Sequence, residues 1–109
     1  MAINPVFAES EPQRASLDTL EAPLLVEFGT PWCGYCKAVQ PLLDEALAEF
    51  PDVHHLKIED GPGRRLGRSF RVKLWPTLVF MNRGREVARL VRPADAATIR
   101  EALRALASA

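Results

Sequence analysis

The stretch VEFGTPWCGYCK, residues 26–37, carries the strongest structural signal in the chain. Its first residues belong to a nearly continuous apolar run over residues 24–28, which is typical of a β-strand buried on both faces. The breakers at residues 29–31 end that run. From residue 34 to residue 50 the apolar side chains recur with helical spacing. The two cysteines of this stretch therefore lie where a buried strand passes into a helix.

The helix predicted over residues 34–50 has one apolar face and contains a proline. Pro41 removes a backbone hydrogen bond inside the helix and should kink its axis, and Pro51 should end it. The apolar face consists of Val39, Leu42, Leu43, Ala46, Leu47 and Phe50.

The rest of the chain predicts an α/β sandwich with a mixed central β-sheet flanked by helices on both faces. Strands separated by helices are expected to run parallel, whereas the short link at residues 82–85 is typical of an antiparallel hairpin. We expect one domain over residues 1–109, with an N-terminal strand and helix segment over residues 1–20 and a core over residues 24–107. The further expected elements are a strand over residues 3–8, a helical turn or two over residues 16–22 capped by Ser16, strands over residues 53–58, 77–81 and 86–91, a short helix over residues 64–70, and a last helix opened by Pro93 with Ile99, Leu103 and Leu106 on its apolar face.

The composition is that of a soluble globular domain. The chain has 109 residues, of which 48% are apolar and 26% charged. No apolar run approaches the roughly 20 residues that a membrane-spanning helix needs, and the first residues do not have the pattern of a signal peptide. We therefore expect a cytoplasmic protein without a membrane partner. In a reducing compartment a pair of cysteines is more often catalytic or metal-binding than structural.

The charges are unevenly distributed along the chain although they cancel in total. Residues 1–60 carry 11 acids and 3 bases, whereas residues 61–109 carry 11 bases and 3 acids. The densest basic run, RRLGRSFRVK at residues 64–73, contains one aromatic residue, Phe70. A solvated helix face explains this run better than nucleic-acid binding does, because the chain as a whole is not basic.

The spacing of Cys33 and Cys36 favours thiol–disulfide exchange. Cys33 falls at the start of the helix, where unpaired backbone N–H groups and the helix dipole favour a thiolate, and we expect it to be exposed. Cys36 lies one turn further in and should be more shielded. The exposed sulfur would attack a substrate disulfide, and the shielded one would resolve the mixed disulfide.

Two other interpretations of the cysteine pair are weaker. A structural zinc ion needs four ligands, but the chain has no further cysteine, and the adjacent strand residues His54 and His55 point to opposite faces. Inert core thiols would not explain a strand-to-helix turn flanked by tryptophan and glycine. We therefore expect no metal.

Several motifs in the correct order resemble the thioredoxin family. They are residues 26–37, the proline at position 41, WPTLVF at residues 75–80, and the closing hairpin with its glycine turn, which together extend from about Leu24 to Leu106. The resemblance implies a thioredoxin fold, a cis bond between Trp75 and Pro76 beside the cysteines, and no cofactor beyond the cysteine pair. It also implies that Trp32 packs beside Cys33 and shields it.

The resemblance assigns a catalytic role to Glu27, because the family carries a buried acid below the second cysteine. Glu27 also interrupts an otherwise apolar strand, although an outward-facing residue would do the same. A buried carboxylate could take the proton of Cys36 during the second attack. Either His55 or Lys57 could pair with it. Lys37 could stabilise a thiolate or simply be solvated.

Three features depart from the family pattern. Tyr35 stands where general reductants have proline, and a Gly-Tyr pair is similar to bacterial disulfide isomerases, while tyrosine here also occurs in glutaredoxins. Tyr35 is expected to free a backbone N–H for the Cys33 thiolate and so to raise the reduction potential. Trp75 is bulky, and Arg92 with Pro93 replaces an expected glycine. The predicted substrate groove comprises Trp32, Gly34, Tyr35, Trp75, Pro76 and Arg92.

These features predict a cytoplasmic protein-disulfide reductase, active as a monomer and supplied with electrons by a thioredoxin-reductase-type donor. One alternative is glutathione-dependent, glutaredoxin-like or isomerase-like exchange, although the chain lacks a Gly-Gly pair after the hairpin. A second alternative is a redox-silent docking adaptor, which the intact cysteine pair disfavours.

Overall fold

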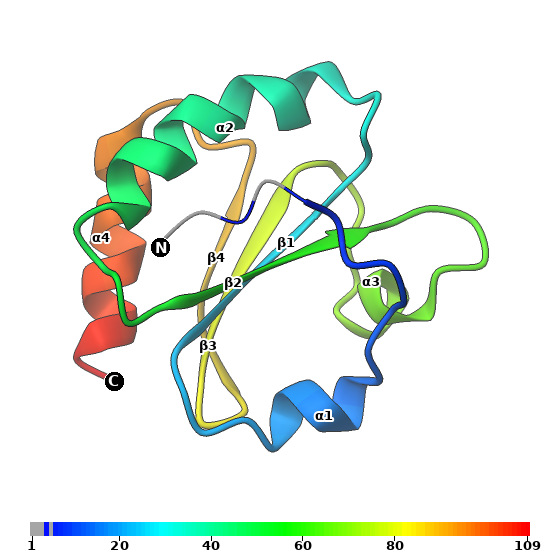
Figure 1. Cartoon of the computed structure of the whole chain (residues 1–109), viewed down its shortest axis with the longest axis horizontal. Helices are drawn as coiled ribbons and strands as arrows, with labels where there is room; N and C mark the ends of the chain where they lie inside the picture. The colour runs from blue at the N-terminus through cyan, green and yellow to red at the C-terminus, as the bar shows by residue number, and fades with distance from the viewer. Residues whose placement is uncertain (1–3, 5) are drawn as a thin grey trace.

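The computed structural model describes residue 4 and residues 6–109, which form a four-stranded β-sheet and four helices. The helices α2 and α4 gather on one side of the sheet, and α1 and α3 gather on the other (Figure 1). The predicted fold class is therefore confirmed. The elements in chain order are α1 (Arg14–Asp18), β1 (Leu24–Gly29), α2 (Gly34–Leu47), β2 (His54–Glu59), α3 (Arg65–Ser69), β3 (Thr77–Asn82), β4 (Arg85–Val91) and α4 (Ala96–Ala107).

The strand order is β2-β1-β3-β4, and only β1 and β2 run parallel. β3 is antiparallel to both β1 and β4. The expectation that a helix between two strands makes them parallel is therefore wrong for β2 and β3. A helix of five residues rises only about 7.5 Å, whereas a strand of six residues spans about 20 Å. Because α3 cannot carry the chain back along the sheet, β3 starts at the edge where β2 ends.

Alternating side chains of the strands build two cores. Odd positions of β1, such as Leu25, face α2 and α4, and even positions, such as Val26, face α1 and α3. The first core consists of Leu25, Val39, Leu43, Ala46, Leu47, Val53, Leu78, Phe80, Ile99, Ala102, Leu103 and Leu106. The second consists of Leu17, Leu24, Val26, Phe28, Ile58, Leu66, Phe70, Val79 and Met81.

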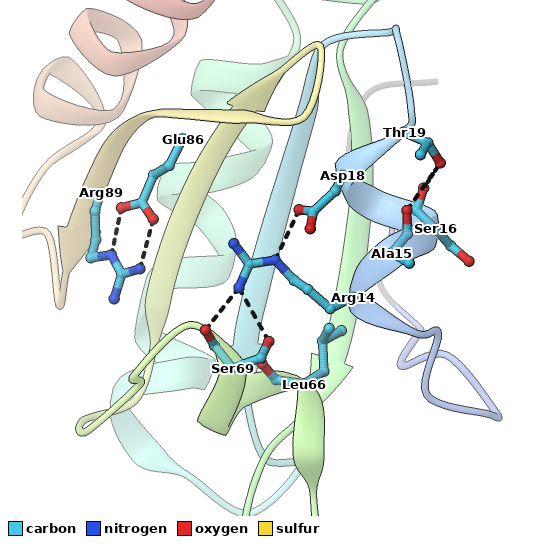
Figure 2. A network of polar contacts seen from close by, with 9 residues as sticks. All are labelled: Arg14, Ala15, Ser16, Asp18, Thr19, Leu66, Ser69, Glu86 and Arg89. Carbon is cyan, nitrogen blue, oxygen red and sulfur yellow. Dashed lines mark hydrogen bonds and ion pairs between the residues drawn. The ribbon is translucent and has the colours of Figure 1, made fainter.

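Arg14 fastens α1 to α3 on the second face (Figure 2). Its Nη1 donates to the backbone oxygen of Ser69 at 2.8 Å, and its Nε donates to Asp18 at 2.9 Å. The guanidinium also lies 3.6 Å above the ring of Phe70. These contacts hold α3 against α1, and α3 precedes the loop that carries Trp75 and Pro76.

Several element ends differ from the sequence prediction. α1 begins before Ser16 and has no side-chain cap, so Ser16 does not cap it. α2 ends at Leu47, three residues early, and α4 begins at Ala96 behind Asp95, whose carboxylate accepts from the Thr98 N–H at 2.8 Å. The helix that we expected Pro93 to open therefore begins three residues later and is capped by Asp95. Residues 4 and 6–8 do not form the expected strand, and residues 3 and 5 lie outside the described residues.

The hairpin between β3 and β4 is confirmed. Its two loop residues, Arg83 and Gly84, have φ angles of 53° and 77°. Positive φ at both central positions is the geometry that joins two antiparallel strands through a two-residue loop.

Candidate functional site

Cys33 and Cys36 lie at the junction of β1 and α2. Cys33 is the N-cap residue of α2, and its Sγ accepts a hydrogen bond from the backbone N–H of Cys36 at 3.2 Å. Both cysteines are free. The Cys33 sulfur thus occupies the place at the start of a helix where a backbone donor and the helix dipole stabilise negative charge.

Two expectations about the pair are wrong. Cys33 is 8% exposed and Cys36 is 3% exposed, so both sulfurs are buried and exposure hardly distinguishes them. The backbone N–H that reaches Cys33 belongs to Cys36 and not to Tyr35. Any residue at position 35, including proline, would leave this donor in place, so the expected effect of Tyr35 on the thiolate has no support in this geometry.

The surroundings of Cys36 keep it protonated. Burial raises the pKa of Cys36 to about 12, with a further increase from its hydrogen bond to Cys33 and from the nearby charge of Glu27. A backbone hydrogen bond at Thr30 lowers it only in part. One sulfur is therefore a helix cap and the other is a thiol at neutral pH, which is the asymmetry that sequential attack requires.

Gly29 makes the room that Cys36 occupies. A Cβ atom at this position would lie 2.6 Å from the Cys36 sulfur. Gly29 is the last residue of β1 and faces α2, like Leu25 and Glu27 before it. The absence of a side chain here is therefore a packing requirement of the cysteine pair.

Glu27 is buried, with 1% of its surface exposed, and both of its oxygens accept hydrogen bonds. His55 Nε2 lies 2.8 Å from Oε1, and Gln40 Nε2 donates to Oε2 at 2.7 Å. His55 Nδ1 accepts from the backbone N–H of Asn4 at 2.7 Å, so the proton of a neutral ring lies on Nε2 and points at Glu27. Two donors aimed at the two oxygens satisfy this buried side chain and fix its orientation.

The structure decides between the two candidate partners of Glu27 in favour of His55. Lys57 instead donates to Gln40 Oε1 at 3.2 Å. Sequence reasoning missed Gln40, whose Nε2 also donates to the Cys36 backbone oxygen at 2.9 Å. The available signal was spacing, since a residue four positions after Cys36 lies on the same face of the helix.

The loop before β3 brings a second set of predicted residues to the cysteines. The bond between Trp75 and Pro76 is cis, as the resemblance implies. The Cys33 sulfur lies 4.0 Å from the Trp75 backbone oxygen. Trp75 also donates from Nε1 to Asp60 at 2.9 Å, which fixes its ring. Trp32 packs edge-on against that ring with 5.6 Å between centroids, and it is 70% exposed, so it shields Cys33 less than expected.

Arg92 joins this loop to the cysteine turn. Its Nε donates to the Trp75 backbone oxygen at 2.8 Å, and its guanidinium lies 4.0 Å from the centre of the Tyr35 ring. Its backbone N–H donates to the Pro76 oxygen at 3.1 Å, and its φ angle is 51°, a conformation that favours the glycine we expected there.

Gly34 has no neighbour within 4 Å of a hypothetical Cβ. All six predicted groove residues therefore lie on the segments around Cys33, while Lys37 is exposed.

Two features are not found among residue 4 and residues 6–109. No group of three or more histidine, cysteine, aspartate or glutamate side chains is placed to hold a metal ion. No helix in this part of the chain is long and apolar enough to cross a membrane.

The fold and the site together define a class of proteins that carry a cysteine pair at the start of a helix, opposite a cis-proline loop on a mixed sheet. The family model described as thioredoxin matches residues 6–105. The chain belongs to the thioredoxin family.

Individual relatives agree with this membership. Thioredoxin H8 of Arabidopsis thaliana is 40% identical over 68 residues, which are 62% of this chain and 46% of that protein. Thioredoxin C-3 of Corynebacterium nephridii is 37% identical over 70 residues, 64% of this chain and 48% of that protein. The chain thus spans about half the length of these curated relatives. The structure of thioredoxin 2 from Pseudomonas aeruginosa in its reduced form is similar with a TM-score of 0.86 and 57% identity, covering 97% of this chain and 98% of that one.

Proposed function

We propose that this chain is a thiol–disulfide oxidoreductase that reduces protein disulfides through Cys33 and Cys36. The observation that carries the proposal is the asymmetry of the pair. The Cys33 sulfur accepts a backbone hydrogen bond at a helix start, whereas the pKa of Cys36 is raised to about 12. In such a pair the first sulfur attacks the substrate disulfide, and the second stays protonated until it resolves the mixed disulfide.

The proposed reaction transfers two electrons from the dithiol to the substrate. The Cys33 thiolate attacks one sulfur of the substrate disulfide, and the other leaves as a thiolate that takes up a proton. Cys36 then loses its proton and attacks the Cys33 sulfur of the mixed disulfide, which releases the second substrate thiol. The protein ends with a disulfide between Cys33 and Cys36, so a dithiol or an enzymatic thioredoxin-reductase-type donor must reduce it before the next turnover.

Glu27 is the proposed acceptor of the Cys36 proton. A carboxylate can act as a general base, and the hydrogen bonds with His55 and Gln40 fix the position of this one below α2.

The compartment and the partners are part of the proposal. A dithiol that must stay reduced to work suits a reducing compartment, so we place the protein in the cytoplasm. We propose that it acts there as a monomer on protein disulfides. The thioredoxin match over residues 6–105 favours this function over a glutaredoxin-like, isomerase-like or redox-silent alternative.

Insulin reduction with dithiothreitol as the electron source tests the proposal. We expect the wild-type chain to accelerate precipitation of the insulin B chain and both Cys33→Ser and Cys36→Ser to lose this activity. In a substrate-trapping experiment, Cys36→Ser should accumulate mixed disulfides and Cys33→Ser should not. Absence of wild-type turnover would favour the docking adaptor. Turnover of a glutathionylated peptide with glutathione, but none of insulin, would favour the glutaredoxin-like alternative.

A further inference from the structure

A guanidinium without an acidic partner lies on the rim of the cysteine pair. Arg92 is exposed, and two contacts orient it, the bond from Nε to the Trp75 backbone oxygen at 2.8 Å and the stack on Tyr35 at 4.0 Å. Within the described ranges, residue 4 and residues 6–109, no carboxylate oxygen pairs with Arg92, and its Nη1 and Nη2 donate no hydrogen bond. The free edge of the guanidinium is thus held in one orientation beside Cys33.

Two hollows adjoin this rim. One, of about 430 Å³, lies between α2 and the loop after β4 and combines Arg92 with the apolar side chains of Val39, Leu42 and Pro93. The other, of about 310 Å³, adjoins Trp75. Its cationic side chains are Arg64, Arg68 and Lys73.

Two acids lie close to the second hollow. Asp60 lines it and accepts the uncharged indole N–H of Trp75, and Glu59 lies 3.6 Å from Arg64. Arg68 and Lys73 are exposed, and neither forms an ion pair in the described part of the chain. The cations around the two hollows, Arg92, Arg64, Arg68 and Lys73, therefore outnumber the acids Asp60 and Glu59, although the chain as a whole is neutral.

We propose that this surface selects disulfides that lie in acidic peptide segments, and that Arg92 is a specificity residue that binds a substrate carboxylate next to the attacked cysteine. The inference rests on the proposed function and narrows its substrate class. Nη1 and Nη2 present the two parallel donors that a carboxylate accepts together. Because Trp75 and Tyr35 already orient the guanidinium, less side-chain freedom is lost when the carboxylate binds.

Synthetic peptides test the proposal directly. Three peptides with one intramolecular disulfide would share a sequence except for the residues flanking both cysteines, which are glutamate, glutamine or lysine. The pre-reduced full-length chain is mixed with each peptide, samples are quenched with acid, and the second-order rate constant of disulfide reduction is measured. For the wild type we expect the glutamate peptide to react about fivefold faster than the glutamine peptide, with the difference shrinking in about 0.5 M salt.

Variants separate the role of Arg92 from that of net charge. Arg92→Gln should bring the ratio of the two rate constants close to one, and Arg92→Glu should favour the lysine peptide. Arg85→Gln is the matched control, because it removes the same charge at the hairpin end of β4 and should keep the wild-type ratio. Circular dichroism and thermal midpoints check that each variant is folded.

Two results would overturn the proposal. One is an equal ratio in the wild type and in Arg92→Gln, and the other is an equal loss of the ratio in Arg92→Gln and Arg85→Gln. Failure of the proposed function is distinguishable from both, since the wild type would then reduce none of the three peptides.

Discussion

Replacement of His55 by leucine removes one of the two hydrogen bonds that hold the Glu27 carboxylate inside the protein. The side chains of His55 and Glu27 are 0% and 1% exposed, and 2.8 Å separates Nε2 from Oε1. Leucine cannot donate, so Oε1 would stay buried without a partner. Leaving a buried acceptor without its donor costs about 1–3 kcal/mol, and more when the acceptor is charged. Because Gln40 still donates to the other oxygen, we expect a loss of about 3 kcal/mol of unfolding free energy.

Urea unfolding of the reduced chain at neutral pH measures this loss. Small domains have unfolding free energies of about 5–15 kcal/mol, so a loss of about 3 kcal/mol shifts the midpoint clearly. The matched control is His54→Leu, because His54 is exposed on the same strand and its replacement should change stability by less than about 0.5 kcal/mol.

The double variant separates the pair from the packing of the histidine ring. If Glu27→Leu accompanies His55→Leu, no charge remains to be satisfied, and the double variant should be more stable than His55→Leu alone. A loss below about 1 kcal/mol for His55→Leu, or a double variant less stable than the single one, would refute the conclusion that the buried hydrogen bond between His55 and Glu27 stabilises the fold.

Three further predictions concern the cysteine pair and the helix starts. Gly29→Ala forces the new Cβ against the Cys36 sulfur and should cost about 2 kcal/mol in urea unfolding and slow the second attack, whereas Gly34→Ala, which has open space, should do neither. Because the pKa of Cys36 is raised to about 12, the native state binds the thiol proton more tightly than the unfolded chain, so stability should fall as pH rises from about 9 to about 12, and Cys36→Ala should flatten this fall. An unchanged slope would contradict the buried thiol. Asp95→Ala should cost about 1 kcal/mol because it removes the α4 cap, while Ser16→Ala should cost almost nothing; equal losses would contradict the cap assignment.

Local patterns predicted the parts of this fold that depend on neighbours along the chain. The apolar run around Val26 and the helical spacing after Gly34 indicated β1 and α2, and their junction placed both cysteines. The hairpin at Gly84 followed from two strand patterns and a short link. In each case the deciding interactions join residues that are close in sequence, and these are the interactions that periodicity records.

Local sequence patterns could not predict the contacts between residues that are far apart in the sequence. The direction of β3 depends on how far α3 travels, and a five-residue helix has too few residues for its pattern to show its length reliably. The choice of His55 over Lys57 depends on the register of β2 against β1 and on where Gln40 points from α2. The stack of Arg92 on Tyr35 joins a loop to a helix start 57 positions away, and no periodicity connects them.

Strand β1 combines a local sequence pattern with contacts to residues that are distant in the sequence. Alternate residues of a strand share one face, so Leu25, Glu27 and Gly29 all point from β1 toward α2. Each of the three makes a different contact there. Leu25 packs in the core below α2, Glu27 accepts from Gln40 of that helix, and Gly29 leaves the space that the Cys36 sulfur fills. The burial that stabilises the strand is therefore the same burial that raises the pKa of Cys36. A shift of β1 by one residue would turn all three to the opposite face, so the register of this strand is a condition for the redox chemistry as well as for the fold.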